Sequence, residues 1–135
     1  MTIENLIDFI DRHTNNGAFY PSEPWGEGIG IEEEGAAFIR SFSHRDWLAL
    51  RSLNLKERSN SWVECLIDLL DRAYTEEARQ MIIYIALTGT DENFLDAMEC
   101  IRAFRRSVST YTWLKLENRS TEILSKKLKN QSNNY

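Results

Sequence analysis

Apolar residues recur at helical spacing along most of this chain. The first stripe consists of Ile3, Leu6, Ile7 and Ile10, and Thr2 is its expected N-cap. Further stripes begin near Glu32, Ser43, Ser61, Thr75 and Asp91, and a final one runs from Leu116 to Leu128. This spacing predicts an all-α fold of six or seven helices in antiparallel pairs, with essentially no sheet.

Polar residues that favour helix N-termini mark where several of these helices should begin. Ser43 with Asp46 fits a capping box, and Ser61 is expected to cap the following helix. Thr75 and Asp91 are the expected caps of the next two helices. The helix that follows Thr75 is apolar over much of its circumference, so we expect it to be central.

The apolar stripes also indicate the core. Trp47 and Leu53 should line the buried side of the third helix, and Trp62 that of the fourth. Phe94 and Leu95 should face inward from the sixth helix.

Two parts of the chain are less regular. Residues 17–31 contain both prolines and four of the six glycines, and they predict a loop. The segment from Tyr111 to Leu116 fits either a strand-like stretch or the start of the final helix. Residues from about Lys129 onward should form a frayed, solvated tail.

A weak internal repeat is visible in the middle of the chain. Residues 43–73 and 75–104 each suggest a helix, a short turn and a second helix, with Trp62 and Phe94 at equivalent places. Stacked helix pairs of this kind build an α-solenoid. A compact helical bundle explains the same pattern equally well.

Length and composition bound the class of protein. The 135 residues predict a single helical domain over residues 1–135, and 42% hydrophobic residues are too many for a disordered chain. The longest apolar run, Met81–Leu87, is far shorter than the roughly 20 residues that span a bilayer. The N-terminal stretch lacks a basic segment followed by an apolar one, so we expect a cytoplasmic protein without membrane attachment.

Charge is divided unevenly along the chain. Residues 1–99 carry 19 acidic and 8 basic side chains, whereas residues 100–135 carry 2 acidic and 8 basic ones. The excess of acid favours a basic partner and argues against direct nucleic-acid binding, because phosphate contacts need Lys and Arg. A solvated acidic surface with no partner explains the charge pattern as well.

No motif in the sequence specifies a chemical reaction or a cofactor. His13, His44, Cys65 and Cys100 are not spaced as metal ligands, and both cysteines lie on or beside core stripes. The glycines at 26, 28 and 30 have no preceding strand, and three glutamates follow them where a phosphate would bind. We therefore expect no catalytic residue, no cofactor and no metal site.

The combination of aromatic and acidic residues is the strongest candidate for a binding surface. Tyr and Trp are common interface anchors, and neighbouring carboxylates can pair with Lys and Arg of a partner. The predicted partner-binding residues are Tyr20, Glu23, Trp25, Glu27, Glu33, Asp68 and Asp71. Alternatively, the aromatic side chains fold back over the core and the carboxylates form a solvated face.

The central region resembles a known family. The pattern Ser43-x-x-x-Trp47-x-x-Leu50, followed by Ser61-Trp62-x-x-x-Leu66-x-x-Leu69-Leu70, is similar to the HEAT-like immunity proteins of bacterial polymorphic-toxin and contact-dependent inhibition systems. The resemblance covers residues 40–105. It implies a HEAT-like helical fold and a non-enzymatic protein that binds a cognate toxin, often a nuclease with a basic substrate groove, and blocks it.

Two other functions remain open at this point. The first is a helical-repeat adaptor that binds a protein or peptide unrelated to toxins. The second is a small hydrolase centred on His13 or His44, although neither histidine has an evident catalytic partner in the sequence.

Overall fold

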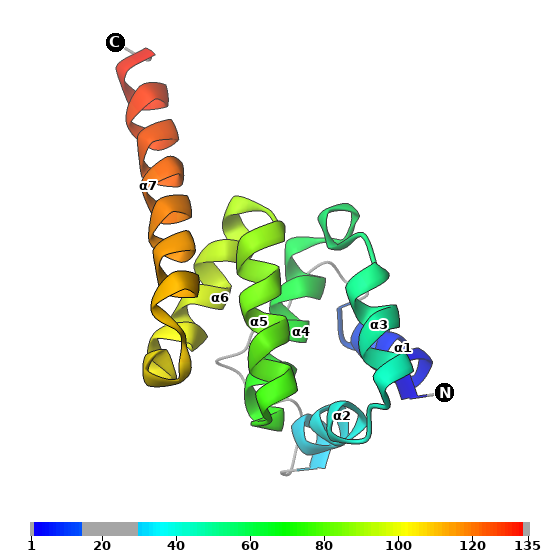
Figure 1. Cartoon of the computed structure of the whole chain (residues 1–135). Helices are drawn as coiled ribbons and strands as arrows, with labels where there is room; N and C mark the ends of the chain where they lie inside the picture. The colour runs from blue at the N-terminus through cyan, green and yellow to red at the C-terminus, as the bar shows by residue number, and fades with distance from the viewer. Residues whose placement is uncertain (1, 15–29, 134–135) are drawn as a thin grey trace.

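The computed structural model describes residues 2–14 and 30–133, and these residues form helices joined by short connections (Figure 1). The α-helices are α1 (Thr2–Thr14), α2 (Gly30–Arg40), α3 (His44–Ser52), α4 (Asn60–Ala73), α5 (Glu76–Thr88), α6 (Asp91–Ala103) and α7 (Thr110–Asn133). Short 3-10 helices, η1 (Leu55–Glu57) and η2 (Arg105–Ser107), follow α3 and α6. No strand occurs within the described ranges, which confirms the all-α fold.

Two of the predicted helix caps are confirmed. The Ser43 hydroxyl accepts a hydrogen bond from the Asp46 backbone N–H (3.2 Å), and the Asp46 carboxylate accepts one from the Ser43 N–H (2.9 Å). The same carboxylate also accepts the backbone N–H of Ile3 (3.2 Å), so one side chain joins the start of α1 to the start of α3. These hydrogen bonds, led by that from the Ser43 backbone, lower the pKa of Asp46. Thr75 caps α5 by accepting from the Ala78 N–H (3.2 Å).

Two other predicted caps were wrong by one or two residues. Ser59, rather than Ser61, caps α4 by accepting the backbone N–H three residues along the chain. Thr90, rather than Asp91, caps α6 and forms a reciprocal capping box with Asn93. In both cases a Ser or Thr just upstream of the predicted cap has the backbone and hydroxyl geometry of an N-cap. The helix therefore begins earlier than the apolar stripe alone indicates.

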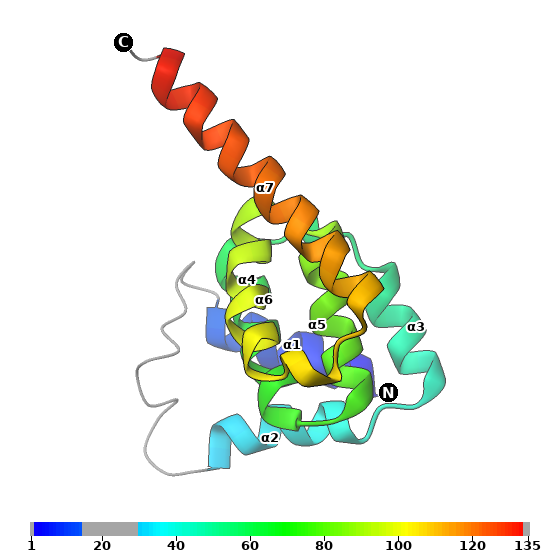
Figure 2. The same ribbon diagram turned by 60° about the vertical axis from the view of Figure 1, so that its left-hand side comes forward.

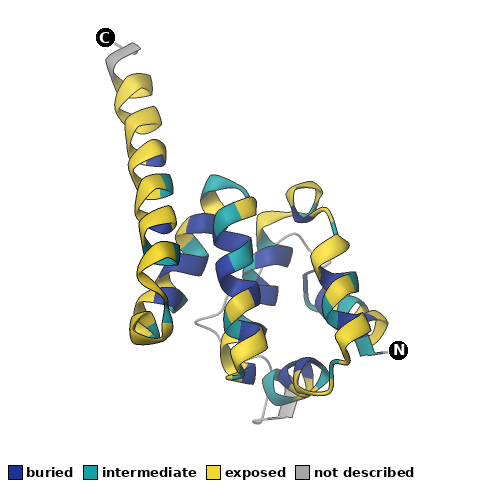
Figure 3. Cartoon of the chain, in the orientation of Figure 1, coloured by how far each residue is buried: buried dark blue, intermediate teal, exposed yellow. Residues whose placement is uncertain are grey.

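The core lies between α4 and α5 and the helices that cover them (Figure 3). Trp62 is only 4% exposed, as predicted. Trp47 and Leu53 are half-buried, because α3 lies at the edge of the molecule. The prediction for Leu95 was wrong, because this side chain is 44% exposed. The buried face of α6 contains Phe94 and the residues three to four positions after it, and Leu95 lies outside that face.

The packing of the helices favours a bundle over a regular solenoid. α5 and α6 lie closely side by side, as the repeat predicts. α4, however, packs against α2, α5, α6 and α1, whereas α3 packs against α1 and not along α4. Residues 43–73 therefore do not form a helix hairpin equivalent to residues 75–104.

α2 begins earlier than predicted, at Gly30, so the end of the predicted 17–31 loop is helical. This helix approaches its neighbours closely at Gly35. A Cβ added there would lie 2.7 Å from side-chain atoms of both Leu69 on α4 and Phe9 on α1. A side chain at position 35 would therefore force Leu69 and Phe9 to shift from their places in the core.

α7 decides one open alternative and differs from one expectation. The region from Tyr111 to Leu116 is the start of the final helix and not strand-like, and this helix continues to Asn133 instead of fraying near Lys129. Its inward side contributes Leu116 and Ile123 to the core, and beyond that point the helix extends away from the body (Figures 1 and 2).

Two arginines of outer helices donate hydrogen bonds to backbone carbonyls at the carboxyl ends of inner helices. Arg40 of α2 donates through Nε to the carbonyl of Ala73 at the end of α4 (3.1 Å). Arg119 of α7 donates to the carbonyls of Ala86 (2.8 Å) and Gly89 (2.6 Å) at the end of α5. Both satisfy carbonyls that a helix end leaves unpaired, and a cation there also suits the helix dipole. Within the described ranges, no helix is both long and apolar enough to cross a membrane.

Candidate partner-binding surface

Carboxylates from α4 and α6 gather on one side of the molecule. On each helix three acidic residues are spaced by four and then three positions, which places them on one helix face. We call this surface the acidic face; its members are Glu64, Asp68 and Asp71 on α4, and Glu92, Asp96 and Glu99 on α6. The two helices are neighbours (Figure 2), and the charges of Asp96 and Glu99 on α6 reach Glu64 on α4, so the two rows form one surface.

The charges of the two rows act on each other. Partial burial raises the pKa of Glu64, and the negative charges of Asp96, Asp68 and Glu99 raise it further. The pKa of Asp96 is raised first by burial and then by Glu99 and Glu92. Because Glu64 lies on α4 and Asp96 on α6, the repulsion crosses from one helix to the other.

Asp68 and Asp71 form the other end of the acidic face. The pKa of each is raised, chiefly because the surrounding protein removes solvent from the carboxylate. Arg72 opposes this shift for both residues, and Arg79 opposes it for Asp71. The net shifts remain upward because the loss of solvent outweighs the attraction of these cations.

The cysteine thiols have no nucleophilic character. Burial, followed by the charges of Asp71 and Asp68, raises the pKa of Cys100 to about 12. The pKa of the Cys65 thiol is raised even further, again mainly by burial. Both thiols are therefore protonated at neutral pH.

The two histidines lie in different surroundings. The His13 ring lies against Phe9, with ring centroids 4.3 Å apart, and Nδ1 is 2.8 Å from the Phe9 carbonyl oxygen. His44 is exposed at the first residue of α3. In the part of the chain that the structure describes, no group of three or more His, Cys, Asp or Glu side chains is arranged to hold a metal ion.

Glu33 differs in its electrostatic surroundings from Asp68 and Asp71, the other predicted binding residues that the structure describes. Its carboxylate forms an ion pair with Arg40 (2.9 Å) and a longer one with Arg72 (3.9 Å). The hydrogen bond from Arg40 lowers the pKa of Glu33, opposite to the shifts at Asp68 and Asp71. Glu33 thus belongs to a charge-compensated network, whereas Asp68 and Asp71 lie together on the acidic face. The other predicted binding residues, Tyr20, Glu23, Trp25 and Glu27, lie outside the described residues.

Sequence reasoning missed Glu64, Glu92, Asp96 and Glu99 as members of this surface. The available signal was their spacing, since the three acids of α6 repeat the spacing of the three acids of α4. The spacing alone could not show that α4 and α6 are neighbours.

Comparison with known protein families, with characterised proteins and with solved structures finds no match to this chain.

Proposed function

We propose that this chain is a non-enzymatic binding protein whose acidic face recognises a basic protein domain. The partner is a cognate bacterial toxin, which the chain neutralises as an immunity protein in the cytoplasm. The observation that carries this proposal is the gathering of six carboxylates from the neighbouring helices α4 and α6 on one surface, where partial burial raises the pKa values of four of them.

The physical argument is one of relieved repulsion. Crowded, partly desolvated carboxylates oppose folding and contribute little to the stability of the chain on its own. Lysines and arginines of a partner would lower the energy of the same groups on binding, and the negative potential would accelerate association. A nuclease toxin presents such cations in its substrate groove, where an acidic protein can replace the phosphate backbone.

The test compares two variants of equal charge. The first neutralises the four carboxylates with raised pKa values: Glu64→Gln, Asp68→Asn, Asp71→Asn and Asp96→Asn. The control neutralises four acids on other surfaces: Asp8→Asn, Glu34→Gln, Glu57→Gln and Glu122→Gln. Both variants raise the net charge equally, so a difference between them reports position and not total charge.

The wild-type chain is used to capture its partner from the organism that encodes it, and the purified pair is then measured by calorimetry. We expect the acidic-face variant to bind at least about tenfold more weakly, and the control to bind within about threefold of wild type. The acidic-face variant should also be more stable than wild type, so its weaker binding could not be attributed to unfolding. Equal affinities of the two variants would refute the proposal.

A second measurement tests whether the protein acts by binding. The activity of the captured toxin is titrated with the wild-type chain. Inhibition that saturates at a fixed stoichiometry supports a binding protein, whereas inhibition by catalytic amounts would show enzymatic turnover and contradict the proposal.

A further inference from the structure

The end of α7 projects from the body of the described structure as an arm (Figures 1 and 2), and Lys126, near its base, borders a hollow shared with body residues such as Lys56 and Asp91. Ile123 is the last buried residue, and every residue from 124 to 131 is exposed (Figures 1 and 3). Leu124 and Leu128 are 59% and 56% exposed, and their spacing of four places them on one face of the helix. We call residues 124–133 the C-terminal arm. Two leucines exposed one turn apart are typical of a helix that docks into a groove.

A groove of suitable character lies between α3 and α5. The groove has a volume of about 380 Å³ and is lined by His44, Trp47, Leu48, Arg51, Glu76, Glu77 and Gln80. Its apolar part consists of Trp47 and Leu48, the latter 53% exposed. A second hollow of about 300 Å³ shares His44, Trp47 and Glu77 with it, so the groove continues past Trp47. The Phe42 ring packs edge-on against the Trp47 ring, with ring centroids 4.9 Å apart, and supports Trp47 at the side of the groove.

The charges of the C-terminal arm and the groove are opposite. The arm carries Lys126, Lys127 and Lys129 and no acidic residue. The rim of the groove carries Glu76 and Glu77 from the first turn of α5.

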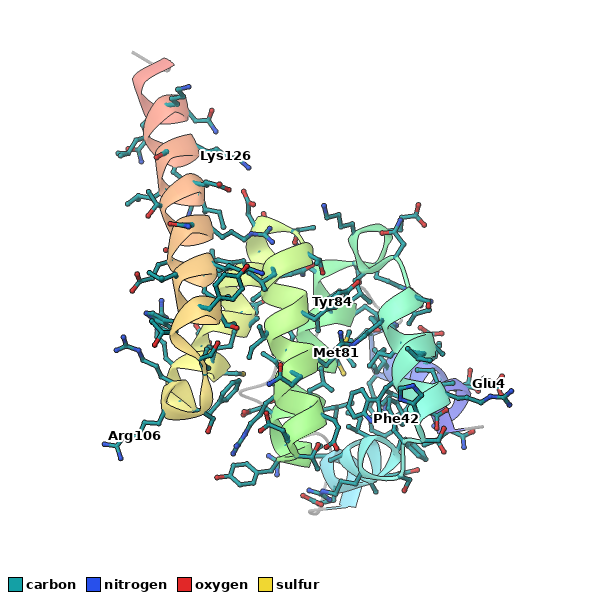
Figure 4. The ribbon with its side chains drawn as sticks, viewed as in Figure 1. Glu4, Phe42, Met81, Tyr84, Arg106 and Lys126 are labelled. Atoms are coloured by element: carbon teal, nitrogen blue, oxygen red, sulfur yellow. The ribbon has the colours of Figure 1, made fainter. Side chains whose placement is uncertain are left out.

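Arg51 reduces this complementarity but does not reverse it, because the groove has two glutamates against one arginine. The Arg51 guanidinium lies over the Tyr84 ring, 5.1 Å from its centroid. Tyr84 extends from α5 toward α3 (Figure 4), and its hydroxyl donates to the Arg51 carbonyl at 3.4 Å. Arg51 is thus held at the side of the groove by an aromatic partner.

We infer that the C-terminal arm of one copy of this chain docks into the α3–α5 groove of a second copy. The arm cannot reach its own groove, because α7 leaves the body on the side away from α3 (Figures 1 and 2). In length the two surfaces agree: the ten residues of the arm and the nine of α3 each span about 14–15 Å. Leu124 and Leu128 would cover Trp47 and Leu48, and the arm lysines would approach Glu76 and Glu77.

The docking is reciprocal. A single arm of ten residues is small against the roughly 1,200–2,000 Å² that a stable interface buries. If each copy places its arm in the groove of the other, the buried area doubles and the assembly closes as a two-fold dimer. The acidic face takes no part in this contact, so the inference goes beyond the proposed function and does not depend on it.

Sedimentation of the full chain across the micromolar range tests the inference. We expect a reversible equilibrium between one and two copies. The substitutions Leu124→Asp and Leu128→Asp together, or Leu48→Asp alone, should weaken self-association by at least about tenfold. Leu114→Asp is the matched control, since Leu114 is a 52% exposed leucine of α7 outside the arm, and it should leave the equilibrium unchanged. All four leucines are more than half exposed, so these variants should keep the helical circular dichroism of the wild type.

A charge exchange tests the register of the contact. One variant carries Lys127→Glu with Lys129→Glu, and the other carries Glu76→Lys with Glu77→Lys. Each variant alone should be monomeric, and an equal mixture should form a heterodimer, because both docking sites then regain opposite charges. A wild-type chain that stays monomeric, a dimer that resists these substitutions, or growth beyond two copies would each overturn the inference. Toxin affinity that persists in the monomeric variants would show that the two surfaces act separately.

Discussion

Arg119 is predicted to hold α7 against the rest of the molecule. Its guanidinium donates to two carbonyls, those of Ala86 and Gly89, and lies 3.7 Å from the Asp91 carboxylate. The apolar contribution of α7 comes from Leu116 and Ile123, which are buried, and from Trp113, which is partly buried against the core. Replacing Arg119 with alanine should therefore loosen α7 selectively.

The magnitude follows from the hydrogen bonds that are lost. A hydrogen bond from a charged donor contributes about 1.5–3 kcal/mol. The Arg119 side chain is 18% exposed, so water can reach part of the vacated site and satisfy the carbonyls incompletely. We expect Arg119→Ala to reduce the free energy of α7 docking by about 2–4 kcal/mol. Arg119→Lys should cost less, because a single ammonium retains the charge but cannot reproduce the two-pronged contact.

Amide hydrogen exchange measures this effect helix by helix. In Arg119→Ala, protection of α7 should fall by more than about tenfold, whereas protection in α4 should change little. Ser120→Ala, at an exposed neighbouring position, is the control. Unchanged protection of α7 would refute the role assigned to Arg119, and an equal loss in α4 would show that α7 unfolds only with the whole domain.

Three further predictions concern stability. Trp62→Ala should lower the free energy of unfolding, measured by urea denaturation, by about 3–5 kcal/mol, and Trp47→Ala by about 1–2 kcal/mol. The reason is that the first side chain is buried and the second half-buried. Equal losses would contradict the placement of α3. Gly35→Ala should destabilise by about 1–3 kcal/mol through the close contacts of its new Cβ, despite the better helix propensity of alanine; a melting temperature at or above that of the wild type would contradict this packing. As pH falls from 7 toward about 5, the free energy of unfolding at low salt should rise, since the raised carboxyl pKa values of the acidic face let the folded state take up protons first. Below about pH 4 the lowered pKa of Asp46 acts in the opposite sense, and a curve that falls throughout from pH 7 would contradict the raised carboxyl pKa values of the acidic face.

The helices were predictable because their signals are local. Apolar spacing located all of them, and the hydroxyl caps at Ser43 and Thr75 identified the starts of α3 and α5. The predicted start of α4 was wrong because Ser59 and Ser61 can both cap a helix. The choice between them depends on the backbone conformation of the residues that precede the helix. The exposure of Leu95 was missed because Phe94 beside it fills the inward position.

The candidate site was only partly predictable, because it depends on contacts between distant segments. Asp68 and Asp71 share a helix face, and this follows from spacing alone. Their continuation through Glu64 to Asp96 requires α4 and α6 to be neighbours, which no local pattern shows. The neutralisation of Glu33 by Arg40 likewise depends on the fold.

The dependence of partner affinity on salt tests the central claim most directly. Affinity of the purified toxin is measured from low to high salt for the wild-type chain and for the variant that neutralises Glu64, Asp68, Asp71 and Asp96. Our account predicts that the affinity of the wild type falls steeply with salt and that the variant shows a much shallower dependence, since the screened charges are those of the acidic face. Equal salt dependence in the two proteins would contradict the claim that this face binds the partner.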